Sequence, residues 1–102
     1  MAEFVAVGRV DDLREGDMRA FDVQDTKIAV ANVGGAIYAF SDTCTHARCS
    51  LSDGDLEETT VTCLCHGSEF DVTSGQVLAP PAREPVASYE TRVVGENIEI
   101  KV

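Results

Sequence analysis

Basic residues are scarce in this sequence. Its 102 residues include 8 Lys and Arg against 18 Asp and Glu, which gives a formal net charge of −10 at neutral pH. Nucleic acids and anionic membranes are bound by basic surfaces, so this balance argues against both as partners. An acidic surface favours solubility and can also steer a basic protein partner, and charge alone does not separate these two roles.

Long apolar runs are missing too. No stretch of the sequence approaches the ~18 apolar residues that a membrane-spanning helix needs. The segment Met1–Arg9 has neither a basic n-region nor an apolar h-region, so no secretory signal is expected there. These absences predict a soluble, cytoplasmic protein.

A helical period of apolar residues is also absent, and the sequence favours β structure instead. Apolar and polar residues alternate over 87–93 and again over 98–102, with turn residues between the two segments. Residues 27–33 are small and apolar on both faces, as in a central strand. The next two residues are both glycine, which predicts a tight turn into a strand over 36–40.

Weaker signals complete the scaffold. Residues 18–23 form a further strand candidate, and residues 11–16 are predicted to hold a short helical turn. No internal repeat, low-complexity tract or linker divides the chain. The predicted fold class is therefore all-β, a small antiparallel barrel or sandwich, in one domain spanning residues 1–102.

Loop-forming residues gather in the middle of the chain. Ser, Thr, Asp and Gly are frequent over 42–58, at Gly67-Ser68 and over 73–75, and three prolines between 80 and 85 mark another stiff loop. Loops held by a rigid sheet are where functional sites usually lie. All four cysteines and both histidines fall between positions 44 and 66, within this loop-rich part. In a reducing cytosol such a cluster indicates metal ligands or redox groups more than a disulfide framework.

The cysteines and histidines follow a defined spacing. Cys44 and His46 read C-x-H, and Cys63 and His66 read C-x-x-H after an interval of sixteen residues. This pattern resembles the Rieske signature, which places one Cys and one His of each loop on a [2Fe–2S] cluster, with Cys₂ on one iron and His₂ on the other. With neutral imidazoles the oxidised cluster has no net charge, which makes it easier to reduce than a four-cysteine cluster.

Three other interpretations fit less well. Zinc sites usually pair like ligands, as C-x₂₋₄-C and H-x₃₋₅-H, whereas each pair here mixes Cys with His. A four-cysteine plant-type cluster could use Cys44 and Cys49, but the spacing of Cys63 and Cys65 does not continue that pattern. Purely structural burial would not explain four cysteines in loops rich in Gly and Ser.

The resemblance extends over nearly the whole chain. Residues 50–54 read S-L-S-D-G, and residues 70–77 precede a pair of prolines, as in Rieske-type ferredoxins of multicomponent aromatic-ring dioxygenases. That family implies a basal barrel and a loop-rich cluster-binding subdomain, here about residues 42–81, with three sheets in all. It implies an electron carrier between an NADH-dependent flavin reductase and a terminal oxygenase, without substrate chemistry of its own.

Further roles are implied by the resemblance. Ser68 matches a serine that donates a hydrogen bond to the cluster in respiratory Rieske proteins, whereas Phe70 replaces their tyrosine donor. Those proteins also join a second pair of cysteines between the loops, and Cys49 and Cys65 are either such a disulfide or two free thiols.

A docking face shared by both partners is expected around the histidines. It comprises Ala47, Arg48, Gly67, Pro80 and Pro81.

Other functions stay open at this point. The chain could carry electrons for another oxygenase or oxidoreductase that accepts them at a similar potential. A non-redox subunit on the same fold is opposed by the presence of all four ligand residues. A structural zinc-binding module is the last alternative.

The part of the chain that carries the ligands is also the most acidic, with seven acidic residues and one basic residue between positions 42 and 71.

Overall fold

The computed structural model describes residues 3–45, 49–65 and 67–101. In these ranges the regular structure consists of β-strands and two single-turn 3₁₀ helices, and no helix there is long and apolar enough to cross a membrane. The elements are β1 (Phe4–Arg9), η1 (Val10–Asp12), β2 (Met18–Val23), β3 (Thr26–Val33), β4 (Ala36–Ser41), η2 (Leu51–Asp53), β5 (Asp55–Glu57), β6 (Thr60–Thr62), β7 (Glu69–Asp71), β8 (Val77–Ala79), β9 (Ser88–Tyr89), β10 (Thr91–Val94) and β11 (Asn97–Lys101). The all-β prediction is confirmed.

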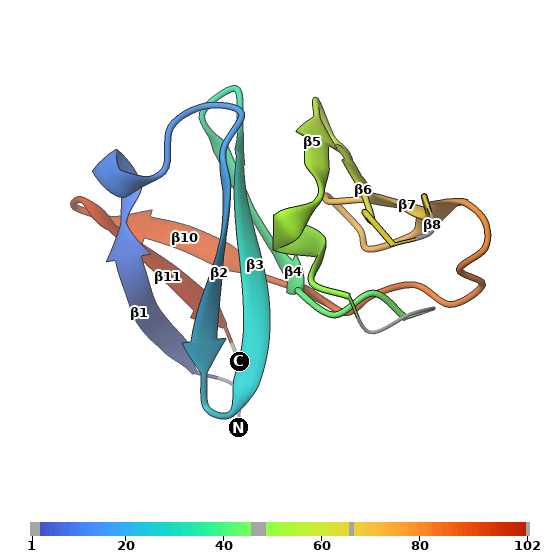
Figure 1. Cartoon of the computed structure of the whole chain (residues 1–102). Coiled ribbons are helices and arrows are strands. Elements are labelled where there is room, and N and C mark those ends of the chain that lie inside the picture. The colour runs from blue at the N-terminus through green and yellow to red at the C-terminus, as the bar shows by residue number, and fades with distance from the viewer. Residues whose placement is uncertain (1–2, 46–48, 66, 102) are drawn as a thin grey trace.

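Two antiparallel sheets form the base of the molecule, which lies on the left in Figure 1. One sheet has the order β1-β11-β10 and the other the order β2-β3-β4-β9. Their inner sides share one core, whose buried members are Leu13, Val23, Ile28, Val30, Ala39, Ile98 and Ile100. Successive residues of a strand point to opposite faces, so the alternation over 98–102 places Ile98 and Ile100 inward.

The central strand β3 is buried on both faces, as its composition predicted. It pairs with β2 on one side and with β4 on the other. Ile28 and Val30 belong to the core of the base, whereas Ala29 and Ala31 belong to a second core on the opposite face. One strand therefore connects the two halves of the molecule.

The second core lies between the base and a third antiparallel sheet of order β5-β6-β7-β8, on the right in Figure 1. These strands have three residues each, and Val61 and Phe70 are fully buried beneath them. Cys44 and Cys63 belong to this same core. The third sheet and its loops form the part of the molecule that we call the tip.

Two expectations from the sequence were wrong in detail, and one strand was missed. Residues 42–58 are not all loop, because η2 and β5 lie within them. The alternating segment 87–93 is not one strand: it breaks at Glu90, so that β9 joins β4 while β10 joins β11. An alternation pattern continues through a corner at which a strand changes sheets, so the pattern could not reveal the break. Strand β1 was not foreseen, because a bulge between Ala6 and Gly8 interrupts its alternation.

Candidate metal centre

Each of the two cysteine-bearing loops is closed by a backbone hydrogen bond of the same kind. The N–H of Cys44 donates to the carbonyl oxygen of Cys49 at 2.9 Å, and the N–H of Cys63 donates to that of Ser68 at 2.8 Å. Both bonds span five residues. Each loop therefore begins at a cysteine, and the backbone five residues later is hydrogen-bonded to that cysteine. This bond fixes the position of the cysteine.

The sequence places a histidine within each loop. His46 follows Cys44 by two residues, and His66 follows Cys63 by three. Both histidines lie outside the described residues, as do Ala47 and Arg48 of the expected docking face.

The cysteines that begin the loops are thiols shielded from solvent. Neither Cys44 nor Cys63 belongs to a disulfide, and their side chains are only 1% and 2% exposed. Both pack in the second core, against residues such as Leu51 and Phe70. Two buried thiols, each at the start of one of two adjacent loops, fit a soft metal centre. Thiolates are soft ligands, and they favour soft metal ions and iron–sulfur clusters. The described donors thus fit the cluster that the sequence predicts.

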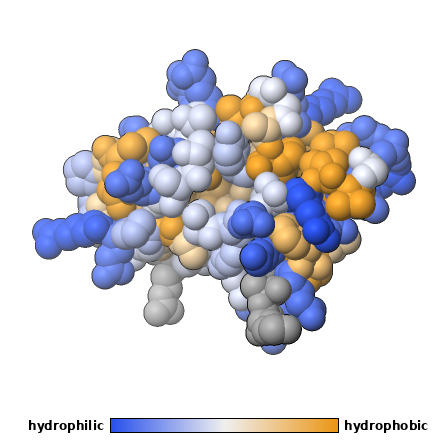
Figure 2. Space-filling view, turned by 180° about the vertical axis from the view of Figure 1, so that it is seen from behind, coloured by the Kyte–Doolittle hydropathy of each residue, from blue (hydrophilic) through white to orange (hydrophobic). Residues whose placement is uncertain are grey.

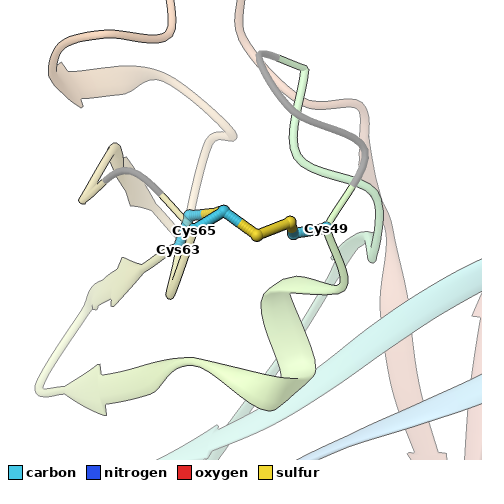
Figure 3. Close-up of side chains that lie close together, drawn as sticks. All are labelled: Cys49, Cys63 and Cys65. Atoms are coloured by element: carbon cyan, nitrogen blue, oxygen red, sulfur yellow. A yellow bond between two sulfur atoms is a disulfide. The ribbon is translucent and has the colours of Figure 1, made fainter.

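A disulfide joins the two loops. Cys49 of the first loop and Cys65 of the second are bridged, with their Cα atoms 6.4 Å apart (Figure 3). The sequence left open whether Cys49 and Cys65 form a disulfide or remain two thiols, and in the structure they form a disulfide. The Sγ atoms of Cys49, Cys65 and Cys63 all lie within 4.8 Å of one another. The bridge therefore lies directly beside one of the buried thiols.

Asp42 fastens the segment that carries the first loop. It is fully buried, its Oδ1 accepts a hydrogen bond from the N–H of Ser52 at 2.7 Å, and its carbonyl oxygen accepts one from the N–H of Leu51 at 2.6 Å. Its own N–H donates to Lys27 of β3. A single residue thus holds both ends of the segment against the base. Sequence reasoning missed this role, because an acidic residue in a loop is usually a solvated one.

A third loop, residues 80–87, is fastened to both cysteine-bearing loops. The N–H of Ala82 donates to Ser68 Oγ at 3.0 Å, and Thr45 Oγ1 donates to the carbonyl oxygen of Glu84 at 2.7 Å. Ser68 is fully buried, and because its oxygen accepts from Ala82, its own proton is available for another acceptor. The peptide bond Pro80–Pro81 within this loop is cis.

Gly75 attaches the other end of the third loop. The N–H of Val86 donates to the carbonyl oxygen of Gly75 at 2.9 Å, and Gly75 has a φ of +83°. A Cβ at this position would overlap the carbonyl oxygen of Val86. Only glycine satisfies both the left-handed conformation and the close approach.

A groove of about 550 Å³ lies beside the first loop. Of the residues that the structure describes, Thr45, Pro81, Arg83 and Glu84 line it. On the second loop, Leu64 is 63% exposed, which is unusual for a leucine, and Gly67 is exposed as well. Among the described residues, the surface around the two loops therefore combines the exposed apolar side chain of Leu64 with the charged side chains of Arg83 and Glu84.

The outer face of the third sheet is strongly acidic. Cross-strand partners share a face, and the register pairs Asp55 with Thr62 and Thr62 with Glu69. In the same way Glu57 pairs with Thr60, and Thr60 with Asp71. Four carboxylates therefore point to one side of the three strands β5, β6 and β7, and no basic residue belongs to these strands. We call these four residues, Asp55, Glu57, Glu69 and Asp71, the acidic face.

Known proteins are similar to this chain along most of its length. The family model described as "Rieske [2Fe-2S] domain" matches residues 3–90. The ferredoxin component of biphenyl 2,3-dioxygenase from Rhodococcus jostii (strain RHA1) is 38% identical over 87 residues, which are 85% of this chain and 81% of that relative.

Two solved structures share the whole fold. The ferredoxin of carbazole 1,9a-dioxygenase from Nocardioides aromaticivorans IC177 has a TM-score of 0.92 and 33% identity, and the match covers 95% of both chains. A complex of reduced oxygenase and oxidized ferredoxin in carbazole 1,9a-dioxygenase contains a chain with a TM-score of 0.90 and 32% identity. That match covers 95% of this chain and 91% of the other.

Proposed function

The chain belongs to the Rieske [2Fe–2S] family, and from this premise we propose that it delivers single electrons to the terminal oxygenase of an aromatic-ring-hydroxylating system. It is a ferredoxin, an electron-transfer protein and not itself an enzyme, and its cofactor is one Rieske-type [2Fe–2S] cluster. The observation that carries the proposal is that ferredoxin components match over nearly the full length of both chains.

We propose Cys44, His46, Cys63 and His66 as the ligands, in a single domain of residues 1–102 whose cluster-binding part spans about 42–81. The burial of both thiols and the matching closure of the two loops support this assignment. A bound cluster at this site would supply one-electron redox chemistry. The protein's own contribution is to hold the two loops together and to exclude water from the thiol side.

The partner proposed first is a terminal oxygenase, since the solved complex of a similar chain joins a ferredoxin to an oxygenase. The second is an NADH-dependent flavin reductase, which would load the electron. Because NADH is an intracellular reductant, this pairing supports a cytoplasmic location, which belongs to the same proposal. Both partners would use one face around the loops, which comprises Ala47, Arg48, Gly67, Pro80 and Pro81.

Metal content and electron transfer test the proposal together. We expect a red-brown protein with about two iron and two acid-labile sulfide per chain, the stoichiometry of a [2Fe–2S] cluster. The reduced protein should be reoxidised by an aromatic-ring dioxygenase in stopped-flow mixing. A colourless zinc protein would contradict the cluster, and a normal cluster that no such oxygenase reoxidises would favour a different oxidoreductase as the partner.

The ligand assignment has its own test. His66→Ala should abolish the cluster, because metal binding and the ordering of its loops are coupled. The electron paramagnetic resonance spectrum of the reduced variant is the readout. A spectrum identical to that of the wild type would show that His66 is not a ligand.

A further inference from the structure

Three sulfur atoms meet between the two loops, and two of them form a disulfide. Cys49 and Cys65 form the bridge, while Cys63 keeps its thiol within 4.8 Å of both. Figure 3 shows the bond between Cys65 and Cys49 of the other loop, with Cys63 directly beside Cys65. A thiol held beside a disulfide is the arrangement from which thiol–disulfide exchange proceeds.

We propose that the cluster-free chain uses these three sulfurs as an exchange site, in which Cys63 attacks the bridge at Cys49. The Cys63 thiol gives up its proton, and its sulfur forms a bond to Cys49 Sγ. The bond between Cys49 and Cys65 breaks, and Cys65 leaves with the electron pair and takes up a proton. One disulfide and one thiol exist before and after the step, so no oxidant or reductant is consumed.

The surroundings of the two bridged sulfurs favour attack at Cys49. Cys65 is exposed, so water can solvate the charge that develops on it as it leaves, whereas Cys49 is only partly exposed. The product bridge between Cys49 and Cys63 still joins the two loops. Attack at Cys65 would instead expel the less exposed Cys49, and the new bridge would join two residues of one loop and leave the loops untied.

The exchange and the cluster compete for the same sulfur. This consequence, unlike the exchange itself, rests on the proposed role of Cys63 as a ligand. In the rearranged chain Cys63 is part of a disulfide and cannot bind iron, so the chain is held in a form that does not load a cluster. The step is reversible, because the released Cys65 can attack Cys49 in turn. A bound cluster removes the Cys63 thiolate from the equilibrium and so keeps the original bridge.

Two variants that each lack one proposed ligand separate the exchange from simple loss of the cluster. Cys44→Ser leaves the three sulfurs in place, and Cys63→Ser removes the attacking one. Both full-length variants are kept metal-free without reductant, and free thiols are then trapped with N-ethylmaleimide in acidic denaturant. Digestion with trypsin and a glutamate-specific protease separates Cys49 from Cys63 and Cys65, because Glu57 and Glu58 lie between them. Mass spectrometry then locates the label.

In Cys44→Ser we expect the label on Cys65 to rise at least tenfold above its level in Cys63→Ser. Label confined to Cys63 after incubation would overturn the exchange. Label on Cys49 that equals or exceeds the label on Cys65 would overturn the direction of attack. Circular dichroism checks the fold of Cys44→Ser, and if it is unfolded, the wild-type chain stripped of its cluster by a chelator gives the same readout and the same decision. The iron and sulfide content of the untreated wild type tests the proposed function separately.

Discussion

The hydroxyl group of Ser68 is buried and accepts one hydrogen bond within the protein. Its oxygen accepts from the N–H of Ala82, which leaves its proton for an acceptor on the cluster side of the loop. A donor to a cluster sulfur favours the reduced state, because reduction makes the sulfurs more negative. The resemblance to respiratory Rieske proteins assigned only this donor role to Ser68. The structure adds that Ser68 also fastens the third loop.

Ser68→Ala should therefore lower the reduction potential. If the lost donor favours the reduced state by about 1–2 kcal/mol, the shift is roughly 40–90 mV for one electron. Protein-film voltammetry measures it. Ser68→Thr keeps the hydroxyl group and is the matched control, which should retain most of the wild-type potential. An unshifted potential in Ser68→Ala would show that the hydroxyl group does not face the cluster.

Phe70 offers the converse change. Its ring is fully buried in the second core, at the position where respiratory Rieske proteins have a tyrosine donor. Phe70→Tyr should raise the potential by a similar ~40–90 mV if the new hydroxyl group reaches a ligand thiolate. Urea unfolding shows whether the core accepts the added oxygen. An unchanged potential in a variant of unchanged stability would mean that this ring points away from the cluster.

At the scale of elements, the tip consists of short strands and loops that depend on a few fastening points. Strands of three residues contribute little pairing of their own, and the loops gain their order from contacts with the base. Asp42 and Gly75 are two such points. The disulfide is a third, and under the chain-entropy picture a bridge closing a loop of this length contributes roughly 3 kcal/mol.

Asp42→Ala should loosen the first loop. It removes the acceptor of the Ser52 N–H, and a polar group left without a partner in a partly buried site costs about 1–3 kcal/mol. We expect a lower free energy of unfolding in urea and faster loss of the visible absorbance of the cluster in the presence of a chelator. Asp42→Asn keeps an oxygen in place of Oδ1 and should lose much less. Equal losses in both variants would mean that the negative charge, not the hydrogen bond, is what the site requires.

On the scale of the whole molecule, charge and apolar surface are distributed unevenly. The chain extends 39 Å along its longest axis, with the base at one end and the tip at the other (Figure 1). Seen from behind, hydrophobic side chains gather over the base end in Figure 2, and β10, with the half-exposed Val93 and Val94, belongs to this end. The acidic face lies at the tip. Such an asymmetry can orient the molecule as it approaches a basic partner.

The acidic face should accelerate encounter with a redox partner. Glu57→Gln combined with Glu69→Gln should slow reduction by the flavin reductase roughly three- to tenfold at low ionic strength. Steering by a whole charged surface raises association rates by about 10–10³-fold, and the two substitutions remove part of that charge. The difference should shrink as salt screens the charges. Stopped-flow measurement over a range of salt concentrations records both effects.

A pair of substitutions on the base provides the matched control. Glu3→Gln combined with Asp25→Asn changes the net charge by the same amount. Both residues are exposed; Glu3 precedes β1 and Asp25 lies in the turn between β2 and β3 of the base. This pair should leave the rate close to that of the wild type. Equal slowing by both pairs would show that net charge alone, and not its position at the tip, governs the encounter.

Local patterns in the sequence determined the β class, the central strand β3 and the kind of cofactor. Each of these depends on residues that are close in sequence: the alternation within a strand, the two glycines of a turn, the C-x-H and C-x-x-H pairs. The physical constraint acts over a few residues, so a few residues suffice to reveal it. The choice between a bridge and two thiols for Cys49 and Cys65 stayed open, because it depends on how closely two loops approach.

Only the tertiary structure decided how the loops are held. The hydrogen bond of Thr45 to Glu84 joins residues 39 positions apart, and that of Ala82 to Ser68 joins residues 14 apart. The acidic face likewise exists only because three short strands pair in one register. The meeting of Cys63 with the bridge and the division of segment 87–93 between two sheets have the same origin. Contacts between distant segments depend on the packing of the whole core, which no short pattern of residues records.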